Sequence, residues 1–321
     1  MILILSNAYF QTSMDEVIDW LNYLKKDFIR LNGLNDYELQ RIYSDLSKDI
    51  IEFTNNKKID TSKIKSVWFY RWGHVNHVSE LKLPTEISLQ AESIKKNITA
   101  NRIVLSGYLM YKLRNAKWLG HYNIPSLNKL AVLAYAQSIG LKIPATLVTN
   151  NLKDLMIFKR KHQNIITKAM AELSQIEFED KIFASFTSEV KNDLDLKDRN
   201  TLSPTLVQEK IDKKFEIRSF YIKGKFYSMA IFSQSDPKTT IDFRKYNDKK
   251  PNRNIPFNLP KIIQNKLIKL FESLNLNTGS VDIIYNTRQE YIFLEINPVG
   301  QYGMTSKPCN YYLEKLIAES L

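Results

Sequence analysis

The run Gly279-Ser280-Val281-Asp282-Ile283-Ile284-Tyr285 and the run Tyr291-Ile292-Phe293-Leu294-Glu295-Ile296-Asn297-Pro298 are two apolar segments of strand length. The polar connection between them predicts a β-hairpin. Glu295 and Asn297 are two residues apart, so on a strand both side chains leave from one face, and Asp282 on the partner strand can point to that face too. Two carboxylates and an amide oxygen are hard ligands that suit Mg²⁺ holding nucleotide phosphates. The alternative is a hairpin whose Glu295 and Asn297 face solvent.

Composition sets the outer limits. The chain has 321 residues, 44% of them hydrophobic and 25% charged, which is typical of globular proteins with a sizeable core. The net charge of +12 permits nucleic acid, an anionic membrane, nucleotide phosphates or an acidic peptide as partner. We expect neither nucleic acid nor a membrane, because no nucleic-acid motif is present and no apolar run approaches ~20 residues. The single Cys309 fits a reducing compartment, so we expect a cytoplasmic protein.

The first 140 residues alternate strands with helices, which predicts an α/β domain. The chain from Asp15 has apolar residues at helical spacing, and we expect this helix to stop at Asn32-Gly33. The other expected elements are a buried strand at 2–5, a polar loop at 7–14, partly helical structure at 37–51, a strand at 65–73, helix at 80–113 and a helix at 128–139.

From residue 141 the pattern changes to strands of period two with short turns, which predicts an antiparallel-rich α+β region. The fold class is therefore α/β plus α+β. The expected elements are strands at 141–150 (broken by Pro144), 164–168, 182–187, 206–211, 215–222 and 226–232, and a helix at 261–274.

Charged residues recur at or near strand ends in this half of the chain. Taken singly, each is an ordinary surface charge, and an exposed ion pair is worth only ~0.2–1 kcal/mol. Their order along the chain is less easily explained by chance; it runs Lys168, Gln208-Glu209, Glu216 and Arg218, Asp242 and Arg244, Asp282, Glu295 and Asn297. The four histidines lack metal-ligand spacing, and His74 and His77 are better interpreted as loop residues.

This order resembles that of the ATP-grasp ligases. The flanking segments are similar to those of the peptide maturases of graspetide (microviridin-like) pathways, especially the grasp-with-spasm branch. The segments concerned are Met1 to Ser6, Val17 to Leu21, Val67 to Arg71, Asn128-Lys129, Gly140 to Asn150 and Asp242 to Tyr246. The resemblance covers essentially the whole chain.

The resemblance implies an ATP-grasp fold of three parts. An N-terminal pre-ATP-grasp α/β domain over residues 1–140 would recognise the precursor. A central lobe over 141–205 and a C-terminal lobe over 206–321, which holds the Mg²⁺ site, would clasp ATP between them.

The resemblance also assigns roles by position. Lys129 and Lys168 would reach the phosphates, and Arg218 and Arg244 would be the catalytic residues that face the γ-phosphate and the acyl-phosphate. The remaining implied roles are the adenine hinge at Gln208, Glu209, Lys210 and Ile211, the ribose contact at Glu216 and the Mg²⁺ ligands Asp282, Glu295 and Asn297. The chain departs from the family in having no glycine between Gly140 and Gly224, so residues 170–180 would have to cover the phosphates.

The implied activity is that of an ADP-forming ligase that uses ATP and Mg²⁺. It would activate Asp or Glu side chains of an acidic ribosomal precursor peptide as acyl-phosphates. Condensation with Ser or Thr hydroxyls or a Lys amine would then give macrocyclic esters or amides. A homodimer is implied as well, and we expect the aromatic segment Trp68 to Trp72 to help bind the leader.

Three alternatives stay open. A ligase that adds a free amino acid such as glutamate to a protein or small molecule would use the same nucleotide site. A nucleotide-binding regulator would lack catalysis. A nucleic-acid-binding protein would be another use of the positive charge.

Overall fold

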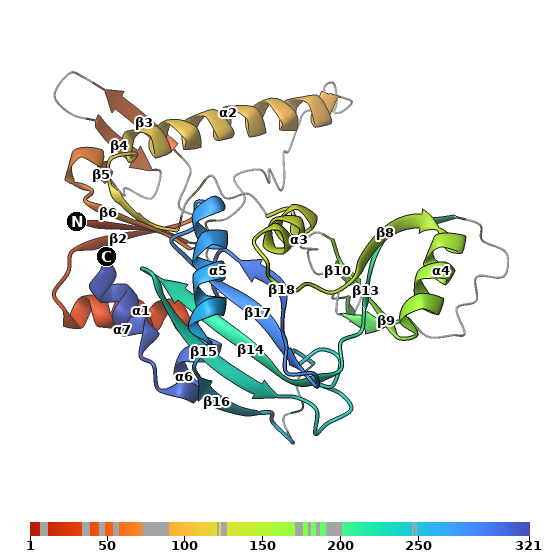
Figure 1. Cartoon of the computed structure of the whole chain (residues 1–321). Coiled ribbons are helices and arrows are strands. Elements are labelled where there is room, and N and C mark those ends of the chain that lie inside the picture. The colour runs from red at the N-terminus through yellow and green to blue at the C-terminus, as the bar shows by residue number, and fades with distance from the viewer. Residues whose placement is uncertain are drawn as a thin grey trace. The chain divides into compact units, whose positions relative to one another are not determined.

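The chain forms two compact units, residues 1–123 with 312–321 and residues 124–311. The boundaries expected at residues 140 and 205 stay predictions. The computed structural model describes residues 1–6, 12–33, 39–44, 49–53, 58–70, 72, 90–120, 122, 127–170, 176–178, 181–183, 187–190, 201–245, 247 and 249–321. Sheets and helices alternate through both units (Figure 1), so the protein is a mixed α/β structure, as expected.

The described part of the first unit contains a parallel four-stranded sheet with the order β2-β1-β6-β7, the helices α1, α2 and α7, and a small antiparallel sheet. Every residue of β1 is buried, as the predicted apolar run requires for a strand with neighbours on both edges. The bounds are β1 Ile2–Ser6, α1 Thr12–Tyr23, β2 Phe28–Asn32, β6 Ser66–Phe69, α2 Ala91–Lys112, β7 Lys117–Leu119 and α7 Leu313–Ser320.

The C-terminal helix α7 belongs to this first unit. It packs against α1, and Lys26 Nζ donates to the Ala318 carbonyl oxygen at 2.9 Å, while Lys117 donates to the Ser320 carbonyl oxygen. Cations at the end of a helix complement its unpaired carbonyl groups. The two lysines therefore stabilise the last turn of α7.

Two local predictions in this unit are wrong. The helix expected from Asp15 to residue 32 begins at Thr12 and ends at Tyr23, and residues 28–32 form β2 instead. Residues 28–32 pair in parallel with β1, so tertiary pairing overrides their helical spacing. Residues 7–11 of the expected polar loop lie outside the described residues.

The partly helical structure expected at 37–51 is also wrong. The described residues of this segment, 39–44 and 49–51, belong to an antiparallel sheet. Its strands are β3 Leu39–Ser44, β4 Asp49–Phe53 and β5 Lys58–Asp60, and a short 3₁₀ turn, η2 Thr61–Lys63, follows them. Ile42 and Ile51 are partners in the register and contribute to the hydrophobic core of the unit. β-branched side chains favour such a pleated surface.

The aromatic strand β6 is mostly internal. Trp68 and Tyr70 are 2% and 4% exposed, and their rings contact each other at 5.0 Å between centroids. These two residues therefore support the sheet and offer little surface to a leader peptide. Trp72 is partly buried, and Arg71, Gly73, His74 and His77 lie outside the described residues.

The second unit contains two main antiparallel sheets, of orders β12-β9-β13-β8 and β16-β15-β14-β17-β18, and the hairpin β10-β11. Most strands predicted here are confirmed, including the break at Pro144 between Lys142 and β8. The bounds are α3 Lys129–Ser138, β8 Thr146–Asn151, α4 Leu152–His162, β9 Ile165–Lys168, β10 Ile176–Phe178, β11 Lys181–Phe183, β12 Ser188–Glu189, β13 Thr201–Glu209, β14 Lys213–Ile222, β15 Lys225–Phe232, β16 Arg253–Phe257, α5 Lys261–Ser273, β17 Thr278–Asn286, β18 Tyr291–Asn297 and α6 Gly303–Cys309.

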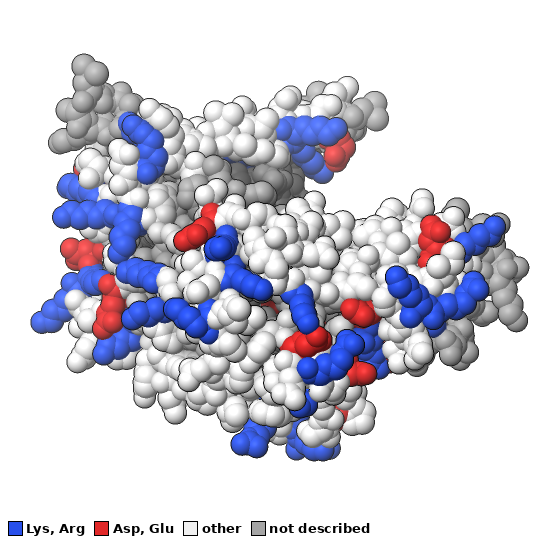
Figure 2. Space-filling model, in the orientation of Figure 1, with Lys and Arg blue, Asp and Glu red and all other residues white. Residues whose placement is uncertain are grey.

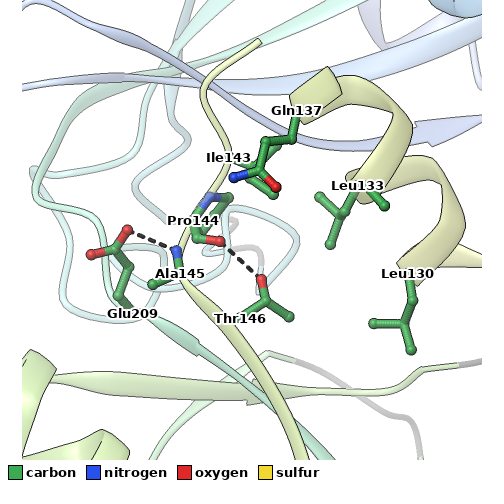
Figure 3. A pocket seen from close by; sticks show the side chains of 9 residues that line it. Leu130, Leu133, Gln137, Ile143, Pro144, Ala145, Thr146 and Glu209 are labelled. Carbon is green, nitrogen blue, oxygen red and sulfur yellow. Dashed lines mark hydrogen bonds between the residues drawn. The ribbon is translucent and has the colours of Figure 1, made fainter. Parts of the chain in front are cut away.

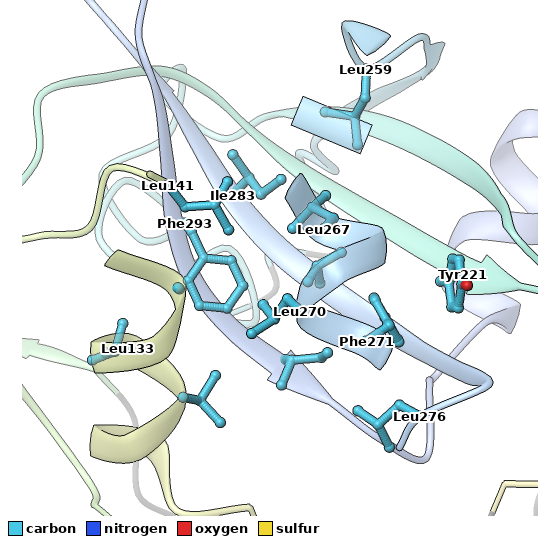
Figure 4. Close-up of a cluster of buried hydrophobic side chains, with 14 of the residues drawn as sticks. Leu133, Leu141, Tyr221, Leu259, Leu267, Leu270, Phe271, Leu276, Ile283 and Phe293 are labelled. Carbon is cyan, nitrogen blue, oxygen red and sulfur yellow. The ribbon is translucent and has the colours of Figure 1, made fainter. Parts of the chain in front are cut away.

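The main core of this unit lies between one face of the five-stranded sheet and the helices α5 and α3 (Figure 4). Leu267, Leu270 and Phe271 of α5 are fully buried, and Ile283 and Phe293 of the sheet belong to the same cluster. The opposite face, called the polar face below, carries the charged side chains of the site beside a smaller apolar cluster of Met229, Ile231, Phe243 and Cys309. Among the described residues, no helix has the length and apolar character that crossing a bilayer requires.

The packing of the core predicts that alanine substitutions at two positions of α5 lower the free energy of unfolding by different amounts. Leu270 is fully buried, whereas Ile262 is 65% exposed. We expect Leu270→Ala to lower the free energy of unfolding by about 2–5 kcal/mol, because it removes a buried isobutyl group and leaves a cavity. Ile262→Ala should change it by less than about 0.5 kcal/mol. Urea denaturation of both variants checks this, and equal losses would contradict the packing described.

Candidate functional site

A row of charged side chains crosses the polar face of the five-stranded sheet. Arg218 on β14 is the register partner of Asp282 on β17, and Asp282 is the partner of Glu295 on β18. Directly opposed residues have neighbouring side chains on one face. The prediction that Asp282 and Glu295 share a face is therefore confirmed, and Arg218 extends the row.

A β-bulge in β18 makes this arrangement possible. Asp282 pairs with Glu295, whereas the next residue, Ile283, pairs with Phe293, so Leu294 is the extra residue. In a regular strand Phe293 and Glu295 would face the same side. The bulge lets Phe293 enter the core while Glu295 points to the polar face.

Arg218 and Asp282 form a largely buried ion pair. Nη1 of Arg218 donates to both carboxylate oxygens of Asp282, at 3.1 and 3.0 Å, and the side chains are 5% and 16% exposed. The Arg218 Nη2 group is 3.5 Å from Gln301 Oε1. Nε of Arg218 is buried and has no acceptor among the described residues. One donor of the guanidinium group therefore remains for an oxyanion.

Two lysines reach the same row from other elements. Lys129 is the first residue of α3, after the N-cap Asn128, and its Nζ lies 3.8 Å from Glu295 Oε2 and 3.3 Å from the Ala169 carbonyl oxygen. Lys168 ends β9. Burial lowers the pKa of Lys168, the charge of Glu295 opposes this, and the charge of Lys129 lowers the pKa further. Lys129 thus lies beside Glu295, and the charge of Lys168 is near enough to interact with that of Glu295.

Arg244 follows the strands on a turn held by Asp242. Its Nε and Nη2 donate to the two oxygens of Asp242 at 2.9 and 2.6 Å, which is the bidentate geometry of a strong ion pair. Asp242 is buried and also accepts the Thr187 N–H at 3.2 Å, whereas the Arg244 side chain is 50% exposed. Arg244 contributes to the pKa shifts of both Lys168 and Asp282, so its charge lies close to the row.

The oxygen donors of this row suit a hard divalent cation. Burial raises the pKa of the Asp282 carboxyl, Arg218 opposes this, and Glu295 raises it further. An added cation would relieve the repulsion between these two carboxylates. Each carboxylate oxygen of Asp282 accepts one hydrogen bond from Arg218 and keeps a second lone pair for a metal ion. Asp282 and Glu295 therefore fit Mg²⁺, although the described residues hold no cluster of three His, Cys, Asp or Glu side chains.

The third predicted ligand, Asn297, takes part in a turn. Its Oδ1 accepts the N–H groups of Val299 and Gly300 at 3.1 and 3.3 Å. Asn297 is the register partner of Ser280, two residues along β17 from Asp282. Its role as a metal ligand stays a prediction.

The predicted hinge connects the two main sheets. Gln208 is buried, and its Nε2 donates to Thr146 Oγ1 at 2.9 Å. The backbone N–H groups of Glu209 and Lys210 donate to the carbonyl oxygens of Ala145 and Asn164. These two groups already join neighbouring segments of the protein. The predicted contacts of the hinge, including Ile211, with a base stay predictions.

A groove of about 510 Å³ lies beside this hinge, between α3 and residues 143–146 (Figure 3). Leu130 and Leu133 of α3 line one side, and the Glu209 side chain lies on the other, where its Oε1 accepts the Ala145 N–H at 2.9 Å. Glu209 is the only predicted site residue that lines it. The groove adjoins the charged row along the chain, because Leu130 directly follows Lys129.

Sequence reasoning missed Lys213. Its Nζ lies 2.5 Å from Glu216 Oε1, and both side chains are 7% exposed. Residues three apart on a regular strand point to opposite faces, but the register of β14 shifts between Lys213 and Phe215. That irregularity brings Lys213 to Glu216. The i, i+3 opposite charges were visible in the sequence, but without the bulge they gave no reason to pair them.

Comparisons with known proteins support the fold. No protein-family model matches the chain, and no curated protein matches its sequence. A RiPP-associated ATP-grasp ligase of Chryseobacterium gregarium, solved in complex with ADP and a leader and core peptide, is 27% identical over 99% of this chain and 94% of its own, with a TM-score of 0.79.

Two further structures have the same fold. The macrocyclase MdnC of Microcystis aeruginosa, bound with the precursor peptide MdnA, is 26% identical over 100% of this chain and 99% of its own, with a TM-score of 0.79. The ATP-grasp ligase PsnB, complexed with a minimal precursor variant, Mg and ADP, is 13% identical over 99% of this chain and 96% of its own, with a TM-score of 0.72. The resemblance to ATP-grasp peptide maturases is confirmed.

The pair of Asp242 and Arg244 predicts a pH effect on stability. Burial alone would raise the pKa of Asp242, but the hydrogen bonds and charge of Arg244 outweigh it and hold the pKa below its ordinary value of 3.8. The stability from a lowered carboxyl pKa is present above that ordinary value and is lost as the pH falls through the folded-state pKa. We expect the unfolding free energy of the wild type to exceed that of Asp242→Asn by more at about pH 6 than at about pH 3. Urea denaturation at both pH values measures this, and a constant difference would contradict the pairing.

Proposed function

We propose that this chain is an ATP-dependent peptide maturase. It activates Asp or Glu side-chain carboxylates of a ribosomally made precursor as acyl-phosphates and condenses them with Ser or Thr hydroxyls or a Lys amine. The product is a macrocyclic ester or amide, with ADP and phosphate released. The observation that carries this proposal is the row of Arg218, Asp282 and Glu295, met by Lys129 and Lys168, in a chain that matches two precursor-bound ligase structures over nearly its whole length.

The cations of the row bind and orient the nucleotide phosphates. Lys129 on α3 lies 3.8 Å from Glu295, and Lys168 at the end of β9 interacts with the charge of Glu295, so a triphosphate there would meet positive charge from two elements. Mg²⁺ held by Asp282 and Glu295, with Asn297 as the predicted third ligand, would withdraw charge from the transferring phosphoryl group. The chain's own contribution is therefore to position the phosphates against fixed charges.

The arginines act where negative charge develops. Arg218 keeps a buried Nε donor with no acceptor among the described residues, and Arg244 is half exposed while Asp242 holds its guanidinium plane. Fixed donors of this kind need no reorganisation during the reaction. These features support a role for Arg218 and Arg244 in stabilising the acyl-phosphate and the phosphate that leaves it.

The net positive charge of the chain supports an acidic peptide as its partner. The chain carries 46 Lys and Arg against 34 Asp and Glu, and Lys and Arg are spread over the visible face without forming one block (Figure 2). An acidic precursor complements such a surface. The same proposal includes adenine contacts at residues 208–211 and a ribose contact at Glu216. It also includes recognition of the leader by residues 1–140, two lobes that clasp ATP, a homodimer and a cytoplasmic location.

The first prediction concerns the peptide product. The precursor peptide encoded beside the gene is incubated with the protein, ATP and Mg²⁺, and its mass is measured. We expect loss of whole water molecules, because each ring forms by condensation, and no loss with Glu295→Ala. An unchanged peptide mass with ATP still consumed, and ADP release stimulated by free glutamate, would favour a free-amino-acid ligase instead.

The second prediction concerns nucleotide affinity. We expect Lys168→Met to raise the Kd for ADP with Mg²⁺ about tenfold or more, because a charge-assisted hydrogen bond to phosphate is lost. Lys153→Met on α4 is the matched control, since Lys153 is exposed and should leave the Kd unchanged. Isothermal calorimetry gives both values, with thermal melting as the test of folding. Equal affinities would remove Lys168 from the nucleotide site.

A further inference from the structure

The side chains of the hinge residues Glu209 and Lys210 turn toward the four-stranded sheet. Oε1 of Glu209 accepts the Ala145 N–H at 2.9 Å, and the Glu209 N–H donates to the Ala145 carbonyl oxygen at 3.0 Å (Figure 3). Nζ of Lys210 donates to Glu189 Oε2 at 3.0 Å, and the Lys210 N–H donates to the Asn164 carbonyl oxygen at 2.9 Å. We therefore expect a base at the hinge to meet main-chain groups, whose position these contacts set.

The second oxygen of the Glu209 carboxylate faces a histidine. Nδ1 of His162, the last residue of α4, lies 3.5 Å from Glu209 Oε2, and the two side chains are 15% and 30% exposed. A carboxylate in this position favours the imidazole tautomer that carries its proton on Nδ1. His162 and Ala145 thus hold one oxygen each of the same carboxylate.

The apolar packing of α4 orients the His162 ring. The ring lies against Phe158, four residues earlier on the helix, with 4.4 Å between the ring centroids. Aromatic pairs at such separations attract each other. Phe158 packs in turn on a buried cluster that joins α4 to the sheet and consists of Leu155, Ile165 and Val207. Nδ1 is therefore directed at Glu209 by a side chain that the core of the sheet holds in place.

We propose that His162 is a positioning residue for recognition of the nucleotide base and that it acts through the Glu209 carboxylate on the main chain of the hinge. This inference deepens the proposed function and rests on it, because residues 208–211 must contact adenine. A Glu209 carboxylate that loses the partner of its Oε2 atom can move, and the hinge moves with it. Hydrogen bonds to the base weaken when their geometry changes. The phosphate contacts of Lys129 and Lys168 come from other elements and should be spared.

The test uses two variants that separate the nitrogen of His162 from its ring. His162→Phe keeps a ring against Phe158 but loses Nδ1, whereas His162→Asn loses the ring but keeps a side-chain N–H donor. Isothermal calorimetry gives the Kd for ADP and for GDP, each with Mg²⁺, for the wild type and both variants. The ratio of the two Kd values measures the preference for adenine.

We expect His162→Phe to raise the Kd for ADP by about fivefold to tenfold, because hydrogen bonds between the hinge and adenine are weakened. The Kd for GDP should change by less than about twofold, since guanine presents a different edge and gains less from the hinge. The preference for adenine should therefore fall. His162→Asn should stay within about twofold of the wild type for both nucleotides.

Three further variants test the path through Glu209. Glu209→Gln keeps an acceptor for the Ala145 N–H but loses the charge that faces His162, so it should also weaken ADP binding. Combining it with His162→Phe should add little further loss, because both changes break one contact. Lys161→Met removes an exposed lysine from the same turn of α4 and should leave both Kd values unchanged. Melting temperatures of all variants are recorded as the test of folding.

An unchanged adenine preference in His162→Phe would overturn the proposal, and a loss confined to His162→Asn would show that the ring acts through packing. Equal losses of ADP and GDP affinity that follow the melting temperature would show a general structural role. A wild type that dehydrates the precursor but binds ADP and GDP equally would overturn this inference while the proposed function stands. A wild type that neither binds ADP nor dehydrates the precursor would overturn both.

Discussion

The register of β14, β17 and β18 is the constraint on which the rest of the second unit depends. With Leu294 as the extra residue, Ile283 pairs with Phe293 on the core face and Asp282 with Glu295 on the polar face. A slip of one residue would send the core side chains to the site and the site side chains to the core. The packing of α5 against the core face of the sheet therefore also determines which side chains form the charged row on the other face.

Ion pairs stabilise the buried charged side chains of this row within the fold. Three largely buried carboxylates in the second unit each have a cation within contact distance: Asp282 has Arg218, Asp242 has Arg244 and Glu216 has Lys213. A buried carboxylate without such a partner would have to take up a proton or destabilise the fold. The lysines at 129 and 168 add positive charge beside Glu295. The fold thus holds several Lys and Arg side chains near one another, where they can bind an anionic ligand.

Much of the second unit could be predicted from the sequence because its patterns are local. The period-two run of β14, the hairpin of β17 and β18 and the N-cap Asn128 of α3 all depend on neighbouring residues. The bulges could not be predicted, since register shifts depend on the partner strand, and the pairing of Lys213 with Glu216 follows from one of them. In the first unit, residues 28–32, 39–44 and 49–51 form strands where helix was expected, because long-range strand pairing overrides a weak local preference for helix.

The return of α7 to the first unit has a consequence for how the protein is made. Residues 312–321 pack with residues 1–123, but they leave the ribosome only after all of residues 124–311. The second unit can therefore begin to fold before the first unit is complete, because α1 packs against α7, which is synthesised last of these segments. Closing so long a loop adds an entropic cost and slows the final docking step. During synthesis, the exposed side of α1 is a surface that chaperones would be expected to protect.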